Sequence, residues 1–271
     1  MKFSVVIPTY NRAQKLVHAI ESVRMQDCQD FEIVVVENIS GPLSPETSRV
    51  VREYGKTLGD KIVYTTADNK GVIAKSRNIG ISVARGEFIA FLDDDDQWRS
   101  NKLSLCLKEF DDPDVVGVYH GMVIDGSDYI PDDINYYKML EFGNIYAPLS
   151  SLVVRKGECG LFDEDPELVG AEDFDFLLRL TGNDKYFVCI KEVLGAYASG
   201  GLSENHTKQA KAEIVALNKE FARIDARKGI LGKRTLYRSR AYLRAAVRAS
   251  RSKQILTAIK LVLIGVTRIF I

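Results

Sequence analysis

The stretch Phe88-Ile89-Ala90-Phe91-Leu92-Asp93-Asp94-Asp95-Asp96 places four aspartates directly after a short apolar run. The apolar run predicts a short buried strand. Packed negative charge is unfavourable unless a cation, hydrogen-bond donors or full solvation offsets it. In open α/β sheets, ligands bind beyond the carboxyl ends of the strands, and carboxylate oxygens there suit Mg²⁺ or Mn²⁺, which usually hold substrate phosphates. We therefore expect a metal site here; a solvated surface run is the alternative.

The first half of the chain alternates strand and helix patterns. Strands are predicted at 3–7, 31–36, 61–66 and 87–92. Helices are predicted between them: one carries Leu16, Ile20 and Val23 at helical spacing, and the others span about 46–58 and 72–84. This order predicts an α/β fold with a mostly parallel central sheet flanked by helices and right-handed crossovers.

The second half is less regular. Further strands are expected at 115–124, 150–154, 186–190 and 193–198, and a helix at 171–181. A polar, Tyr-rich segment at 125–142 predicts a mobile loop or an insertion. From residue 205 onward the apolar spacing is helical.

The composition describes an ordinary globular protein. Of the 271 residues, 46% are hydrophobic and 27% are charged, which is enough for a large core. The four cysteines show no metal-ligand spacing, so neither a zinc site nor a disulfide framework is expected. The apolar stretch at the amino terminus is too short for a secretory signal, so a cytoplasmic location is the default.

The formal net charge of zero conceals a strong asymmetry. No acidic residue follows Asp225, whereas twelve Lys and Arg residues lie between Arg227 and Arg268. Residues 230–271 predict a basic amphipathic segment on an anionic membrane surface; the alternative is a pair of helices packed on the acidic body. Residues 255–271 are few for a spanning helix and are interrupted by charge. The aromatic residues of the tail do not interleave with its basic residues, so no nucleic acid is expected as a partner.

Several segments in order resemble glycosyltransferase family 2, whose members are inverting, nucleotide-sugar-dependent enzymes with the GT-A (Rossmann-like) fold. The segments are Val5-Val6-Ile7-Pro8-Thr9-Tyr10-Asn11-Arg12, Phe31–Asn38, Asn69–Val72, Ser76–Gly80, Ala84–Asp96 and Glu172-Asp173-Phe174-Asp175. The resemblance covers roughly residues 3–203. It implies a catalytic domain at 1–226, with a nucleotide-sugar-binding half at about 1–110 and an acceptor-side half at about 111–226. A basic helical tail at 227–271 follows.

The resemblance also assigns donor-binding residues. They are Pro8, Thr9, Tyr10, Arg12, Glu37, Asn38, Arg77, Asp93 and Asp94. Family members commonly carry two acidic residues where this chain has Glu37-Asn38, so the identity of the base is left open. An asparagine offers a donor and an acceptor, which suits a uracil or a thymine. Arg77 is expected to reach the diphosphate, with a solvated helix-face arginine as the alternative.

The family's metal-binding pattern corresponds best to Asp93-Asp94-Asp95. The resemblance implies that Asp95 binds Mn²⁺ or Mg²⁺ and that Asp93 shares in this site while orienting the sugar or ribose. Asp96 is a weaker candidate for the same site.

The resemblance implies a catalytic base as well. Asp173 corresponds to the family's base, which deprotonates the acceptor hydroxyl, and Glu172 is the fallback. The alternative is that both carboxylates merely favour a helix N-terminus. Ser203 and His206 resemble a loop that closes over the diphosphate; the alternative for His206 is a surface histidine.

The sequence therefore predicts a metal-dependent glycosyltransferase that moves a sugar from a nucleotide-diphosphate donor, UDP-linked by preference. The expected acceptor is a glycan or a polyprenyl-diphosphate-linked glycan of surface polysaccharide biosynthesis. The expected location is peripheral, on the cytoplasmic face of the plasma membrane. Two alternatives are a sugar-1-phosphate nucleotidyltransferase and a non-catalytic sugar-nucleotide-binding protein. The segment Pro8–Arg12 lacks the glycine-rich loop that the first alternative needs.

Overall fold

The chain folds into two compact units. The computed structural model describes residues 1–41, 45–134, 136–143, 148–182, 186–198, 205–223, 234–251 and 254–267. Unit 1 comprises Met1–Ile134, Tyr146–Phe162 and Asp184–Ser199. Unit 2 comprises Asn135–Ile145, Asp163–Asn183 and Gly200–Ile271.

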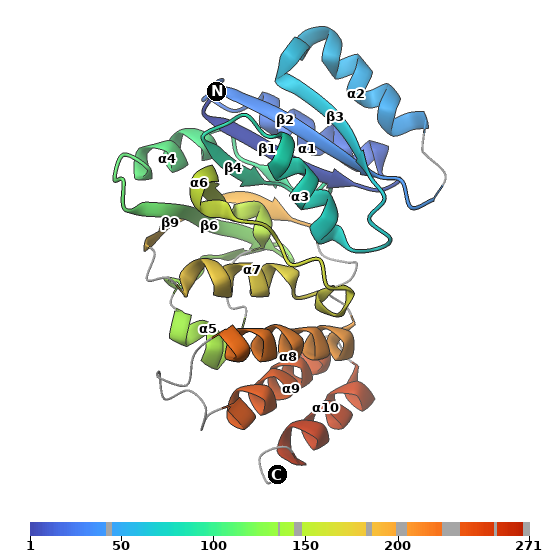
Figure 1. The fold of residues 1–271 in the computed structure, drawn as a ribbon, viewed down its shortest axis with the longest axis vertical. Coiled ribbons are helices and arrows are strands. Elements are labelled where there is room, and N and C mark those ends of the chain that lie inside the picture. The colour runs from blue at the N-terminus through green and yellow to red at the C-terminus, as the bar shows by residue number, and fades with distance from the viewer. Residues whose placement is uncertain are drawn as a thin grey trace. The chain divides into compact units, whose positions relative to one another are not determined.

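Unit 1 is built on a mixed sheet. Within the described residues the sheet holds nine strands in the order β3-β2-β1-β4-β8-β6-β9-β5, with β7 paired to β6 (Figure 1). The strands are β1 (Phe3–Thr9), β2 (Phe31–Asn38), β3 (Ile62–Ala67), β4 (Phe88–Phe91), β5 (Gln97–Trp98), β6 (Val115–Ile124), β7 (Ser127–Tyr129), β8 (Val153–Arg155) and β9 (Tyr186–Tyr197). Strands β1 to β4 are parallel, as the sequence predicts, whereas β8 is antiparallel to both β4 and β6. The parallel block aligns the carboxyl ends of β1, β2 and β4 at one edge of the sheet.

Helices cover both faces of the parallel block. Helices α1 (Ala13–Arg24) and α4 (Lys102–Glu109) contribute to the core that contains alternate residues of β1 and β2. Helix α3 (Ile73–Val83) crosses β1 on the other face. A Cβ atom at Gly80 would lie 2.3 Å from Val6 Cγ1, so only glycine permits this close approach. The same packing fixes the position of Arg77, one turn earlier in α3. Helix α2 (Pro45–Leu58) packs near β3.

The second half differs from the sequence prediction at three places. Segment 125–142 is not one loop, because it contains β7 and helix α5 (Tyr136–Phe142). Residues 150–154 do not form one strand: Leu149–Ser151 is a 3₁₀ turn, and β8 begins at Val153. The two strands expected at 186–190 and 193–198 are one strand, β9, with a register irregularity where the break was expected.

Helices dominate unit 2. They are α5, α7 (Glu172–Thr181), α8 (His206–Arg223), α9 (Arg234–Arg251) and α10 (Ile255–Thr267). One apolar cluster joins the last three helices through small side chains such as Ala210, Ala245 and Ala249, with Leu261 of α10. Arginines of α9 form ion pairs inside the unit, Arg240 with Glu141 and Arg244 with Glu213. Helix α9 therefore packs within unit 2, and part of the basic charge of the tail is compensated there.

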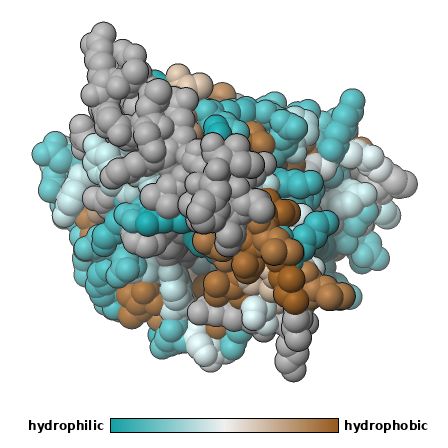
Figure 2. All heavy atoms as spheres, turned by 90° about the horizontal axis from the view of Figure 1, so that it is seen from below, coloured by the Kyte–Doolittle hydropathy of each residue, from teal (hydrophilic) through white to brown (hydrophobic). Residues whose placement is uncertain are grey.

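Helix α10 leaves one face open. Leu256, Ile259, Val262 and Leu263 are exposed, Leu256 to 83% and Leu263 to 61%. Their spacing places them along one side of the helix, and Figure 2 shows hydrophobic side chains gathered into a patch on this face of the molecule. Of the helices in the described part of the chain, none combines the length and the apolar character needed to cross a membrane.

A lysine is fully buried in unit 1. Lys102, the first residue of α4, lies with its Nζ 3.4 Å from the centre of the Trp98 ring. Within the described residues its Nζ has no hydrogen-bond partner. Burial lowers the pKa of Lys102 from its ordinary value of 10.5 to about 7. The ring face offsets part of the cost of burying the cation, but no carboxylate neutralises it by direct contact in the described residues.

We expect Lys102→Met to stabilise the protein. The pKa of Lys102 is lower in the folded than in the unfolded state, so between pH 7 and 10.5 the folded protein binds fewer protons than the unfolded protein. In this range the free energy of unfolding therefore rises with pH. Below it, the buried charged lysine destabilises the fold. The substitution should therefore raise the free energy of unfolding by roughly 2–4 kcal/mol at pH 6, with the gain vanishing near pH 10.5. Urea unfolding at several pH values measures this, with the exposed Lys108→Met of the same helix as control. A gain that is the same at every pH would contradict the argument.

Candidate active site

The four aspartates form a tight turn between β4 and β5. The backbone N–H of Asp96 donates to the carbonyl of Asp93 at 3.1 Å. The side chains of Asp94 and Asp96 are buried, whereas those of Asp93 and Asp95 remain 28% and 18% exposed. The turn therefore separates the aspartates into an inward pair and an outward pair.

Asp94 of the inward pair is held by the last residue of β1 and by the residue that precedes α1. Its carboxylate accepts hydrogen bonds from Thr9 Oγ1 at 2.7 Å and from Arg12 at 3.2 Å. Burial raises the pKa of Asp94 in spite of these donors. The pKa of Arg12 is raised, because the charges of Asp94 and Asp95 outweigh the effect of burial. Thr9, Arg12 and Asp94, all expected in the donor site, are thus brought together.

Asp96 of the inward pair is held from two other strands. One carboxylate oxygen accepts the Ser150 hydroxyl at 2.5 Å, and the other accepts the Ala198 N–H at 2.9 Å. Burial and the nearby charge of Asp93 raise the pKa of Asp96. With no exposed surface, Asp96 is an internal anchor of the turn.

The outward pair is surrounded by cations. Arg77 donates to Asp93 at 3.0 Å. Arg12 and Lys15 contact the same oxygen of Asp95 at 3.1 and 3.2 Å. The sequence analysis did not predict Lys15 as a candidate site residue. Its position one helical turn after Arg12 could have indicated that it lies on the same side of the helix.

Arg77 is the most deeply held of these cations. Only 4% of its side chain is exposed, and its guanidinium lies 5.5 Å from the centre of the Phe162 ring. The adjacent Asn78 fixes Phe162 by two hydrogen bonds to its backbone, at 2.8 and 2.9 Å. Arg77 is therefore not a solvated helix-face arginine.

The ends of β1 and β2 supply the residues expected at the base. Thr9 pairs with Glu37 in the parallel register, and Tyr10 is 45% exposed beyond it. Glu37 is buried; one of its oxygens accepts the Tyr64 hydroxyl, and within the described residues the other, Oε1, has no hydrogen-bond partner. A buried carboxylate oxygen without a hydrogen-bond partner can accept a hydrogen bond from an N–H group of a base.

Asn38, the last residue of β2, stabilises the loop that follows this strand. Its side-chain oxygen accepts the backbone N–H and the hydroxyl of Ser40 at 3.0 and 2.7 Å. Pro8 lies inside β1, paired with Val36, so it shapes the strand end through its backbone.

The outward aspartates have the chemistry of a magnesium or manganese site. Both ions prefer carboxylate oxygens, and Mg²⁺ commonly takes one or two of them, filling its other positions with water and substrate phosphate. Among the described residues, no group of three or more His, Cys, Asp or Glu side chains is arranged to hold a metal ion. Asp93 and Asp95 therefore fit such an ion only when phosphate oxygens complete its coordination.

In unit 2, the expected base lies at the N-terminus of α7. Asp173 is half-buried, and its Oδ1 accepts the N–H of Phe174 at 2.7 Å. Glu172 accepts the N–H of Gly170 at 2.8 Å, which gives it a structural role in the turn that precedes the helix. Both contacts also match the preference of carboxylates for a helix N-terminus.

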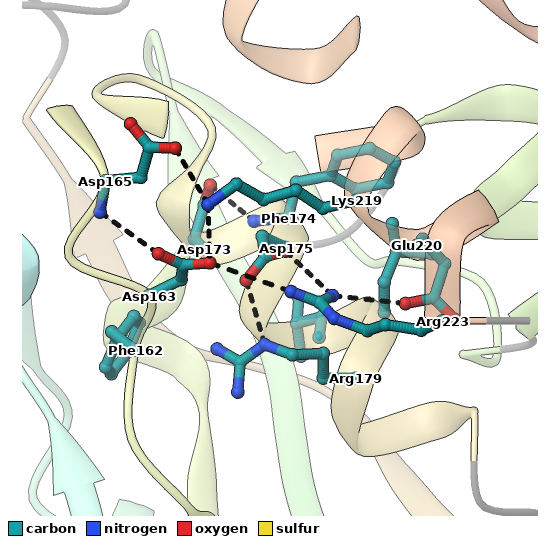
Figure 3. Close-up of polar contacts among 12 residues, drawn as sticks. Phe162, Asp163, Asp165, Asp173, Phe174, Asp175, Arg179, Lys219, Glu220 and Arg223 are labelled. Atoms are coloured by element: carbon teal, nitrogen blue, oxygen red, sulfur yellow. Dashed lines mark hydrogen bonds and ion pairs between the residues drawn. The ribbon is translucent and has the colours of Figure 1, made fainter. Parts of the chain in front are cut away.

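A cluster of charged residues around the buried Asp175 secures α7 (Figure 3). Asp175 is fully buried and accepts from Arg179 at 2.8 Å and from Arg223 of α8 at 3.1 Å. Lys219, also of α8, contacts Asp163 and Asp165, each at 2.8 Å. Helix α8 thus ties α7 and the segment that precedes it into one framework, which sequence spacing alone does not reveal.

Two weaker candidates from the sequence, His206 and Ser203, remain. His206, the first residue of α8, is 6% exposed, so it is not a surface histidine. Ser203 lies outside the described residues.

Comparison with known proteins identifies the family. The model of glycosyl transferase family 2 matches residues 4–164, more than half of the chain. The chain belongs to glycosyl transferase family 2. The matched segment contains the aspartate turn and every donor-site candidate, and ends before Asp173.

Glycosyltransferases of several organisms are similar in sequence. The amylovoran biosynthesis glycosyltransferase AmsB of Erwinia amylovora is 24% identical over 89% of this chain and 83% of its own length. An uncharacterized glycosyltransferase of Nostoc is 35% identical over 60% of this chain. The GalNAc(5)-diNAcBac-PP-undecaprenol beta-1,3-glucosyltransferase of Campylobacter jejuni is 39% identical over 40% of this chain. The alignments span 48% of the Nostoc protein and 34% of the Campylobacter protein, half of their length or less.

Solved structures show the same fold. Staphylococcus aureus TarS 1-349 in complex with UDP-GlcNAc has a TM-score of 0.65 at 17% identity, over 97% of this chain and 90% of that one. The mannosyltransferase PcManGT of Pyrobaculum calidifontis, in complex with GDP-Man and Mn²⁺, also has a TM-score of 0.65, at 19% identity, over 98% of this chain and 75% of its own. These likenesses confirm the predicted GT-A-like α/β fold.

Proposed function

We propose that this family member is a metal-dependent, inverting glycosyltransferase that uses a nucleotide-diphosphate sugar. The observation that carries the proposal is the aspartate turn, which presents two carboxylates to the surface among the cations Arg12, Lys15 and Arg77. Carboxylates bind a divalent ion, and guanidinium groups bind phosphate oxygens. The diphosphate of a sugar donor offers both kinds of partner.

The residues at the ends of β1 and β2 are proposed to bind the nucleotide. The Oε1 of Glu37, which is buried and has no hydrogen-bond partner in the described residues, is proposed to accept an N–H of the base, which suits the N3–H of uracil and the N1–H of guanine. Tyr10, the exposed residue that follows Thr9, is proposed to supply a ring face for the base. A UDP-sugar remains our preferred donor, and a GDP-sugar is the specific competitor.

Asp95 and Asp93 are proposed to hold Mn²⁺ or Mg²⁺. An ion held there would neutralise negative charge on the departing nucleoside diphosphate. The manganese in the PcManGT complex supports this choice of metal. Arg77, which donates to Asp93, is proposed to donate to the diphosphate as it leaves.

Asp173 is proposed to be the general base. It removes the proton of the acceptor hydroxyl while that oxygen bonds to the anomeric carbon and the bond from this carbon to the diphosphate breaks. A single displacement of this kind inverts the configuration. The cluster of Asp175, Arg179 and Arg223 keeps the start of α7 in place.

The proposed acceptor is a glycan or a polyprenyl-diphosphate-linked glycan of surface polysaccharide biosynthesis. Two names support this class: AmsB is named for amylovoran biosynthesis, and the name of the Campylobacter glucosyltransferase contains a PP-undecaprenol-linked glycan. An acceptor of this type lies at the cytoplasmic face of the plasma membrane, so we propose peripheral contact through the tail at 230–271. The exposed leucines of α10 and the excess of basic residues in the tail suit an anionic lipid surface.

Asp95→Asn should strongly reduce metal-dependent turnover. The substitution removes the charge that attracts the ion, and we expect donor hydrolysis or transfer to fall by about 100-fold with Mn²⁺ present. Folding should be unchanged, because the lost ion pairs with Arg12 and Lys15 lie at the surface. The exposed Asp128→Asn is the control. Full turnover that still requires Mn²⁺ would make the metal assignment of Asp95 wrong.

Asp173→Asn should separate binding from transfer. The amide keeps the shape and the contact to Phe174 but cannot take a proton, so kcat should fall by about 10²–10⁴-fold while the Kd for the donor stays the same. Glu172→Gln keeps an acceptor for Gly170 and should retain most activity. Calorimetry with nucleotide sugars and Mn²⁺ measures binding, and product release measures transfer. Loss of donor binding in Asp173→Asn would reject the base role.

Membrane contact should depend on the open face of α10. Deleting the whole tail would also remove the partners of Glu141 and Glu213, so point variants are the sharper test. Leu256→Gln with Leu263→Gln should weaken sedimentation with phosphatidylglycerol vesicles by at least about tenfold, since each exposed leucine contributes on the order of 1 kcal/mol on burial. Met25→Gln, exposed in unit 1, is the control. Unchanged sedimentation of the double variant would exclude this surface.

A further inference from the structure

Ser150 contacts both ends of the aspartate turn. Its hydroxyl donates to Asp96 Oδ2 at 2.5 Å and accepts the backbone N–H of Asp93 at 3.0 Å. Its backbone carbonyl accepts the indole N–H of Trp98 at 2.7 Å. Ser150 and Asp96 are both fully buried. One serine thus joins the first and last residues of the turn and the strand that follows it.

The sheet topology brings Ser150 to this position. Strand β8 is antiparallel to β4, with Val153 opposite Ala90, so the residues just before β8 lie at the carboxyl end of β4. The N–H of Phe91 donates to the carbonyl of Leu152 at 3.2 Å and extends this pairing. Ser150 is 54 residues away from Asp96 in the chain, so the contact is tertiary rather than part of a local turn motif.

The remaining oxygen of Asp96 binds the N–H of Ala198, just after β9. The buried aspartate is therefore anchored to two separate strand ends, while Asp93 and Asp95 alternate with the inward pair and face outward. A shift of the turn backbone would move both outward carboxylates together. Residues that orient metal-binding carboxylates in this way commonly change metal affinity or activity by about 10–100-fold when they are replaced.

We infer that Ser150 is a positioning residue for the metal and diphosphate site. It acts through Asp93 and Asp96, because its buried hydroxyl is already bonded to both of these residues. The inference rests on the proposed function, since it assigns a role within that same site.

Calorimetric titration of the full chain with Mn²⁺ and either UDP or GDP tests the inference. Ser150→Ala should raise the Kd by about 10–100-fold without changing the number of sites per protein. Ser150→Thr retains the hydroxyl and should restore binding close to that of the wild type. Ser151→Ala, which alters an equally buried neighbour, should leave the Kd unchanged.

The outcomes separate three conclusions. If Ser150→Ala lowers only the number of sites while the Kd stays constant, the serine supports folding alone and the inference is wrong. A wild-type protein that binds nucleotide, together with variants that all bind equally well, overturns the inference and leaves the proposed function intact. A wild-type protein that binds neither nucleotide overturns the proposed donor site and, with it, the role of Ser150.

Discussion

Charge compensation at the aspartate turn is the constraint around which unit 1 is arranged. Four consecutive carboxylates repel one another unless donors and cations offset their charge. The compensation comes from distant parts of the chain: the end of β1, helices α1 and α3, the 3₁₀ turn that precedes β8 and the residue after β9. Each of these elements must be in place for the turn to hold its shape. The stability of the sheet edge and the geometry of the site therefore depend on the same contacts.

The parallel half of the fold is predictable from the sequence because its strands are buried on both faces. Segments such as 33–36 then appear as uninterrupted apolar runs, and the helices between them keep helical spacing. The strand ends locate the site, because parallel strands place their carboxyl ends at one edge. Strand order and strand ends therefore predict that Thr9 and the aspartates lie at one edge, whereas Arg12 and Arg77 are assigned to the site from the family resemblance.

The rest depends on contacts that leave no local pattern. Ser150 and Ala198 are ordinary residues in the sequence, and only the antiparallel pairing of β8 and the path of β9 bring them to Asp96. The break expected near residue 191 is a register irregularity inside β9, because an interruption in apolar pattern marks a bulge as readily as a turn. The basic residues of the tail are compatible both with contact to an anionic membrane and with ion pairs to acidic residues of the same protein. Arg240 and Arg244 form such ion pairs, so part of the positive charge of α9 is neutralised within unit 2.

The division of the chain also has a consequence for biosynthesis. Strand β9 lies between β6 and β5 in the sheet of unit 1, yet it follows α7 of unit 2 in the sequence. During synthesis, the sheet can therefore be completed only after residues up to Tyr197 have emerged from the ribosome. Until then β6 has an unpaired edge, which is a site for wrong pairing. The nascent protein thus passes through a stage at which most of its parallel core can form while the aspartate turn still lacks its last anchor.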